Sequence, residues 1–179
     1  PGIALAPGTF NLNIMPSGVD PDAVDPLISQ PVTLESGKSI IAIVTGTATD
    51  LQIVLYEENL APLPSDASRV NVIHAVPRGV QIDMIEANQP LLTALDFGKT
   101  GELDEISTGP HEFDLASGNT TVGTLELDLL ERYAHTIVVY GDPAANLYET
   151  INFRSKVENI SPLRLIHASP DMPAVDVYM

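Results

Sequence analysis

Residues 69–77 read Arg-Val-Asn-Val-Ile-His-Ala-Val-Pro, and residues 162–170 read Pro-Leu-Arg-Leu-Ile-His-Ala-Ser-Pro. The two stretches align without a gap at an offset of 93 residues, from position 69 to position 162. The alignment continues into the next run, where 82–84 (Ile-Asp-Met) meets 175–177 (Val-Asp-Val). Short runs rich in β-branched residues and bounded by turn residues predict β-strands. The chain therefore carries a repeated pair of strands.

The rest of the chain has the same strand-like character. Runs of β-branched and aliphatic residues lie at 40–44, 51–55 and 136–140, and apolar and polar residues alternate over 111–115 and 124–129. The 15 prolines and 12 glycines punctuate the chain between such runs, and both residue types are typical of turns. We therefore expect an all-β chain with almost no helix.

Two further echoes define the length of the repeat. Residues 41–46 match 136–141 at an offset of 95, and the pattern of 8–12 matches that of 109–115. Roughly seven strands in a repeat of about 94 residues are typical of an antiparallel sandwich. We therefore predict tandem antiparallel, immunoglobulin-like β-sandwich domains, cut out of phase. The predicted parts are residues 1–68, a unit lacking its first strands; residues 69–162, a complete unit; and residues 163–179, the first two strands of a further unit.

A proline-containing connection joins the first two parts. Residues 56–68 include Pro62, Pro64 and Ser65, and proline fixes one backbone angle. We expect a short, stiff linker between domains at this point. The extra residues of the first copy fall mainly in 18–26, which we interpret as a loop insertion.

The composition excludes several classes of protein. The 179 residues carry 24 acidic and 8 basic side chains, a net charge of −16, whereas nucleic-acid binders need clustered Lys and Arg to neutralise phosphate. The same charge opposes docking on anionic lipid. Cysteine is missing, so the sequence predicts no disulfide and no thiol chemistry. No apolar run approaches the ~18 residues of a membrane-spanning helix, and we expect no membrane insertion.

A distinctive motif occupies residues 167–178: His-Ala-Ser-Pro-Asp-Met-Pro-Ala-Val-Asp-Val-Tyr. It resembles the signature of a bacterial family catalogued as domain of unknown function 4397. The copy at 74–85 is degenerate: among other changes, Val76, Arg78 and Gly79 replace Ser169, Asp171 and Met172. The resemblance implies a secreted or cell-surface β-sandwich, usually in tandem, and it implies no reaction because the family has no assigned activity. The degenerate copy argues against a catalytic or ligand-binding role shared by the two copies.

The repeated histidine and aspartate need an interpretation. By alternation, His74 and His167 lie on the apolar face of their strands, and Asp83 and Asp176 follow nine residues later. We expect each histidine to bond the backbone of the following turn or to pair with the neighbouring aspartate. A metal or catalytic histidine is the alternative, but no second ligand stands at a typical spacing. We therefore assign a structural role to the motif residues: His74, Asp83, His167, Ser169, Asp171 and Asp176.

Few other residues point to chemistry. His111 and His135 are single, and we expect ordinary surface or strand-end residues. The sequence holds neither a Gly-x-Ser-x-Gly elbow nor a glycine-rich phosphate loop, so we predict no catalytic residue and no enzyme. Asp20, Asp22 and Asp25 fall within six residues, and three carboxylates in one loop suit calcium. The alternative is a solvated acidic loop, and we expect no other cofactor.

Three interpretations of function remain. The first is a non-catalytic structural repeat of a secreted or cell-surface bacterial protein, serving as a stalk, an adhesin or an extracellular filament subunit. The second is a carbohydrate- or cell-wall-binding module, which the lack of tryptophan and the 5% of aromatic residues disfavour. The third is an enzyme, for which no set of residues converges on a nucleophile or metal.

Residues 163–179 raise the question of where they pair. If they begin a further unit, residues 1–68 are two strands short, and a lone hairpin is marginally stable in water. Three arrangements resolve this. The chain is an excerpt of a longer array; or the strands of one copy complete residues 1–68 of the next and build a filament; or the chain closes on itself. We expect neighbouring copies of the chain as partners, and no nucleic acid.

Overall fold

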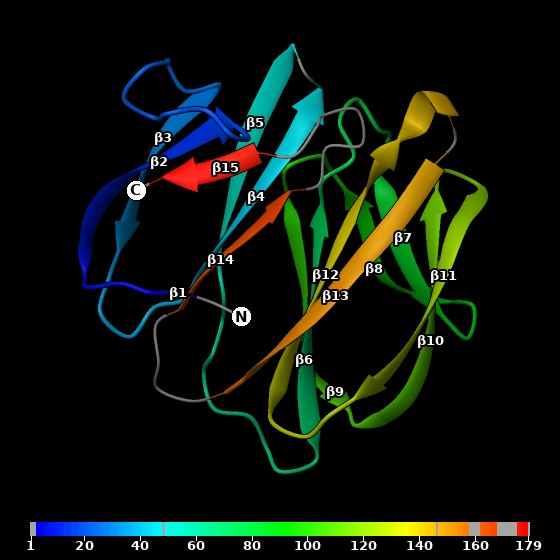
Figure 1. Ribbon diagram of the computed structural model, residues 1–179. Helices are drawn as coiled ribbons and strands as arrows, with labels where there is room; N and C mark the ends of the chain where they lie inside the picture. The colour runs from blue at the N-terminus through cyan, green and yellow to red at the C-terminus, as the bar shows by residue number, and fades with distance from the viewer. Residues whose placement is uncertain (1–2, 48, 146, 158–161, 168–174, 179) are drawn as a thin grey trace. The chain divides into compact units, whose positions relative to one another are not determined.

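The computed structural model of the chain divides into two compact units. Unit 1 comprises Pro1–Glu58 and Asn159–Met179, and unit 2 comprises Asn59–Glu158, so that unit 2 is inserted along the chain between two parts of unit 1 (Figure 1). The structure describes residues 3–47, 49–145, 147–157, 162–167 and 175–178. These residues form strands almost throughout, with a 3₁₀ turn at Pro143–Ala145, and none of them lies in a helix that could cross a bilayer. The all-β prediction is confirmed.

Unit 2 is a sandwich of two four-stranded sheets. Its strands are Ala67–His74 (β6), Ile82–Glu86 (β7), Gln89–Leu95 (β8), Thr100–Ser107 (β9), Gly109–Ser117 (β10), Thr120–Leu129 (β11), Tyr133–Asp142 (β12) and Leu147–Lys156 (β13). One sheet has the order β13-β12-β6-β9 and the other β11-β10-β7-β8. Neighbouring strands are antiparallel except β6 and β12, which run parallel.

The two sheets of unit 2 enclose one apolar core. Because side chains alternate between the faces of a strand, the core takes every second residue, and Phe113 is its largest fully buried apolar side chain. Leu103 and Ile106 of β9 and Tyr148 of β13 pack against it while remaining partly exposed. The buried members are Val70, Val72, Val76, Ile82, Met84, Leu95, Phe113, Leu115, Leu127, Leu129, Ile137 and Val139.

Unit 1 contains one four-stranded and one three-stranded sheet. Its strands are Ile3–Ala4 (β1), Gly8–Pro16 (β2), Ile28–Leu34 (β3), Ile40–Thr47 (β4), Asp50–Glu57 (β5), Pro162–His167 (β14) and Val175–Tyr178 (β15). The sheet orders are β1-β14-β4-β5 and β15-β2-β3. Its apolar core draws buried side chains from four strands, β2 to β5: Leu12, Ile14, Val32, Leu34, Ile40, Ala42, Val44 and Ile53.

Unit 1 follows the plan of unit 2. Strand β14 runs parallel to β4 as β6 runs parallel to β12, and β15 pairs antiparallel with β2 as β7 pairs with β10. The registers agree as well, because His167 lies opposite Val44 and His74 lies opposite Val139. Strands β2 and β10 also share the same succession of exposed, partly buried and buried residues along all nine positions. The offsets seen in the sequence thus correspond to equivalent places in the two units.

The strands within 163–179, expected to begin a further unit, belong to unit 1 in this structure. They occupy the places that β6 and β7 hold in unit 2. Without them, β2 and β4 would each have an open edge of unpaired N–H and C=O groups. Of the three arrangements that the sequence leaves open, the structure has the chain closed on itself.

The two ends of unit 2 meet at Arg132. Its N–H donates to the carbonyl of Ala67, at the start of β6, at 2.9 Å, and its carbonyl accepts from the N–H of Val157, just after β13, at 3.1 Å. The chain therefore enters and leaves unit 2 at the same end of one sheet. This geometry allows a whole unit to be inserted between β5 and β14.

One glycine recurs at the same place in both units. Gly46 in β4 and Gly141 in β12 have positive φ angles of 102° and 146°. A Cβ on Gly46 would lie 2.1 Å from the carbonyl oxygen of Asp50, and one on Gly141 would lie 2.0 Å from that of Leu147. Because any side chain would push the two strands of the hairpin apart, both positions require glycine.

Replacing Gly141 tests this close approach. We expect Gly141→Ala to lower the free energy of unfolding of unit 2 by about 2 kcal/mol or more, because it adds both steric overlap and backbone strain. The matched control is Gly123→Ala in β11, where an added Cβ has nothing within 4 Å and should change stability by less than about 0.5 kcal/mol. Urea unfolding followed by circular dichroism measures both, and equal effects would show that the contact is unimportant.

Candidate functional site

His74 closes the turn that follows β6. Its Nδ1 accepts a hydrogen bond from the N–H of Val76 at 3.2 Å, so Nε2 carries the proton and donates to the carbonyl of Val80 at 3.0 Å. The ring is fully buried, and burial lowers the pKa of His74. Both ring nitrogens are therefore hydrogen-bonded to the backbone of this turn.

Asp83 does not pair with His74. Its Oδ1 accepts a hydrogen bond of 2.7 Å from the N–H of Ala94 on β8. Ala94 has a positive φ of 54° and lies beside a register shift between β7 and β8. A bulge of this kind leaves an amide outside the ladder, and the aspartate satisfies it.

The second copy of the motif is described only in part. His167 lies in β14 opposite Val44, and Asp176 lies in β15 opposite Met15. Ser169 and Asp171 fall outside the described residues. In the described residues, the side-chain contacts of the motif are those of His74 and Asp83 in the first copy.

The acidic loop of unit 1 is a hydrogen-bonded turn. The N–H of Asp22 donates to Oδ1 of Asp20 at 3.0 Å, and the N–H of Ala23 donates to the carbonyl of Asp20 at 3.0 Å. Asp20, Asp22 and Asp25 all lie within the described residues and are exposed or partly exposed, and over that part of the chain no three acidic or histidine side chains gather closely enough to hold an ion. Asp20 thus accepts both of the hydrogen bonds that shape this turn.

His111 fastens the corner between β9 and β10. Its Nδ1 lies 2.6 Å from Oε1 of Glu86 at the end of β7, and its Nε2 lies 2.9 Å from the carbonyl of Ser107 and 3.4 Å from the Ser107 hydroxyl. The ring stacks on Phe113 with an interplanar angle of 8°. Three strands are thereby joined at one side chain, which is not the ordinary residue expected from the sequence.

This corner has the order of a Ser-His-acid triad but not its chemistry. In such a triad the histidine nitrogen that faces the serine must accept the proton of the hydroxyl. Here Nε2 of His111 lies closer to the carbonyl of Ser107, which can only accept. The nitrogen therefore serves as a donor, and the group works as a staple. No sequence motif signals it, because Glu86 is 25 residues away from His111.

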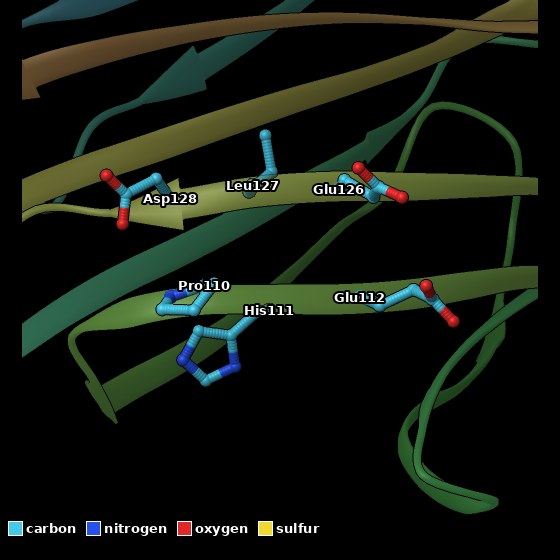
Figure 2. Close-up of a pocket in the computed structure, with 6 residues that line it drawn as sticks. All are labelled: Pro110, His111, Glu112, Glu126, Leu127 and Asp128. Atoms are coloured by element: carbon cyan, nitrogen blue, oxygen red, sulfur yellow. The ribbon is translucent and has the colours of Figure 1, made fainter.

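An acidic hollow lies beside the corner. A cavity of about 470 Å³ is lined by six residues of β10 and β11, drawn in Figure 2: Pro110, His111, Glu112, Glu126, Leu127 and Asp128. Glu112 and Glu126 face each other directly in the register of the two strands, and like charges so placed repel. The hollow thus disfavours anions. The equivalent of Glu112 in unit 1 is the uncharged Asn11, at the offset of 101 residues that relates Gly8 to Gly109.

His135 is buried without becoming a ligand. It is 1% exposed, its Nε2 accepts from the N–H of Leu130 at 3.1 Å, and within the described residues its Nδ1 has no partner. Burial, with a smaller effect from the Arg154 charge, lowers the pKa of His135 to about 4. The expectation of a surface residue is wrong for this position, because its alternation with Ile137 and Val139 turns it inward.

The pH dependence of stability tests the burial of His135. The unfolded chain binds this proton near the ordinary value of about 6.5, whereas the folded chain binds it near 4. Stability is therefore complete above about pH 6.5 and is lost as the pH falls toward 4, by about 3 kcal/mol in total. We expect His135→Gln, which still offers an acceptor to Leu130, to lose less stability between pH 7.5 and pH 4.5 in urea titrations. Identical losses in the two proteins would contradict this.

The sequence also matches a known family. The model of a family described as "Domain of unknown function (DUF4397)" matches residues 3–84 and again residues 68–178. The two matches overlap over β6 and β7, and the second reaches through β14 and β15, the equivalent pair. This overlap agrees with a tandem repeat. No curated protein matches the chain.

Proposed function

Because the chain belongs to the DUF4397 family, we propose that it is a non-catalytic structural repeat of a secreted or cell-surface bacterial protein. It would serve as part of a stalk, an adhesin or an extracellular filament. The observation that carries the proposal is the shared plan of the two units, in which β14 and β15 complete unit 1 as β6 and β7 complete unit 2.

The same plan is compatible with strand exchange between copies. The ladder that β14 forms with β4 needs only backbone groups and the right register, and an identical ladder forms when the strand comes from a second copy. Each copy would then donate its last strands and receive those of another. Such a head-to-tail contact extends into a filament when the rotation between copies does not close into a ring.

The polar groups of unit 2 support a role without catalysis. Both ring nitrogens of His74 are bonded to the backbone, and Nε2 of His111 faces a carbonyl oxygen. The net charge of −16 favours solubility and opposes nonspecific association. These features suit a surface module that is assembled by specific strand pairing.

A carbohydrate- or cell-wall-binding module is the second candidate. The observation in its favour is a hollow of about 360 Å³ between the edges of β11 and β13, lined by aromatic, hydroxyl and carboxylate groups. Tyrosine rings with nearby hydrogen-bonding groups suit a sugar ring, which has an apolar face and polar edges. The lining residues are Leu115, Gly123, Thr124, Tyr140, Tyr148, Glu149 and Thr150.

Complementation with a separate peptide tests the structural proposal. Deleting residues 162–179 should unfold unit 1 and leave unit 2 folded, because β2 and β4 lose their partners. A synthetic peptide of residues 159–179 should then bind the truncated chain and restore protease resistance to residues 8–57. The matched control peptide carries Arg164→Pro and Asp176→Pro, which remove one ladder donor from each strand. Strand donation is excluded if the parent peptide binds no better than the control, or if unit 1 stays folded after the deletion.

Two further measurements separate the candidates. For a surface repeat, antibodies against unit 2 should label intact cells of the source bacterium, and labelling only after permeabilisation would overturn the location. A glycan array should show no binding by the full chain. Binding that is lost in Tyr148→Ala, and kept in the control variant Leu147→Ala, would favour the carbohydrate module instead.

A further inference from the structure

Two consecutive residues between the units are anchored to different sandwiches. Glu58 is 3% exposed, and its N–H donates to the carbonyl of Ser39, in unit 1, at 2.8 Å. The Ser39 hydroxyl donates in turn to Oε2 of Glu58. The residue that follows, Asn59, donates from Nδ2 to Oε1 of Glu102, in unit 2, at 3.0 Å. Glu58 is thus hydrogen-bonded to unit 1, and the next residue, Asn59, is hydrogen-bonded to unit 2.

Arg69 fixes the connecting segment to unit 2 by hydrogen bonds to its backbone. Its side chain is 2% exposed, and Nη1 donates to the carbonyl of Asn59 at 2.7 Å and to that of Ala61 at 3.2 Å. On its other side, Nε and Nη2 reach Oδ1 of Asp104 at 2.9 and 2.7 Å. The guanidinium thus lies between a carboxylate on β9 and the backbone of the connecting segment.

The chemistry of arginine explains the choice of residue. A buried charge is tolerated when it is paired and its donors are satisfied, and a planar guanidinium offers five donors in a fixed fork. Asp104 supplies the opposite charge, while the carbonyls of Asn59 and Ala61 take a donor that points away from it. The connecting segment therefore completes the binding site of Arg69.

We propose that residues 59–61 form a strap that Arg69 locks onto unit 2. The strap stands independently of the proposed function. It also belongs to this connection in particular, since the residue equivalent to Arg69 in the later copy of the repeat is Pro162, whose side chain has no donor.

A spin label on the strap tests the lock directly. The full chain has no cysteine, so Ala61→Cys, at an exposed position, takes a single nitroxide label. We expect the electron spin resonance spectrum to show a slow label, several-fold slower than a label on Ala23→Cys in the exposed loop of unit 1. Adding Arg69→Met should speed the label at position 61 several-fold toward the loop value.

Two further variants keep the test decisive. Asp104 is 51% exposed, so Asp104→Ala should remain folded while loosening Arg69, and it decides the matter if Arg69→Met fails to fold. Lys38→Met removes the exposed partner of Glu57 and should leave the label unchanged. The proposal is overturned if the label at position 61 moves as fast as the loop label in the parent chain. It is equally overturned if the label stays slow in Asp104→Ala and in any folded Arg69→Met, because the Asn59–Glu102 hydrogen bond and the buried Leu63 would then hold the segment without Arg69.

Discussion

Both units depend on a parallel strand pair at the centre of one sheet, β6 beside β12 and β14 beside β4. A parallel neighbour cannot come from a hairpin and must arrive from elsewhere in the chain. In unit 2, β6 precedes its parallel partner β12 in the sequence. In unit 1, β14 follows its parallel partner β4 by more than one hundred residues. The parallel pair forms whether the added strand comes before or after its partner in the sequence. The same pairing is therefore compatible with closure within the chain and with donation between copies.

The backbone hydrogen bonds of Arg132 explain how β14 can be so far from β4 in the sequence. By joining the start of β6 to the end of β13, they bring both ends of unit 2 to one place. Closing a long segment costs chain entropy that grows only slowly with its length, and a folded unit with adjacent ends behaves as a short connection. Unit 2 can therefore lie between β5 and β14 while unit 1 keeps its full set of central strands.

The sequence predicts the elements of this fold better than their partners. Alternation identifies the strands, and with them much of the core of unit 2; Leu125, in the alternating run 124–129, is only partly buried at the margin of that core. The sequence does not decide which strands pair with residues 163–179. Repeats with the same pattern fit the first unit of the same chain, that of another copy or a further unit equally well. The staple at His111 and the strap at Arg69 escape prediction for another reason. Their partners are distant carboxylates and main-chain carbonyls, which leave no periodic signal in the sequence.

Equivalent positions in the two units show which polar groups the fold requires. The corner held by His111 and Ser107 in unit 2 corresponds to Phe10 and Ala6 in unit 1, at the offset of 101 residues. An apolar ring at Phe10 packs against the core of unit 1 just as the imidazole stacks on Phe113 in unit 2. Both units thus place a flat ring at this corner. The staple and the acidic hollow are features that unit 2 adds to a shared frame, just as the loop at 18–26 is a feature of unit 1.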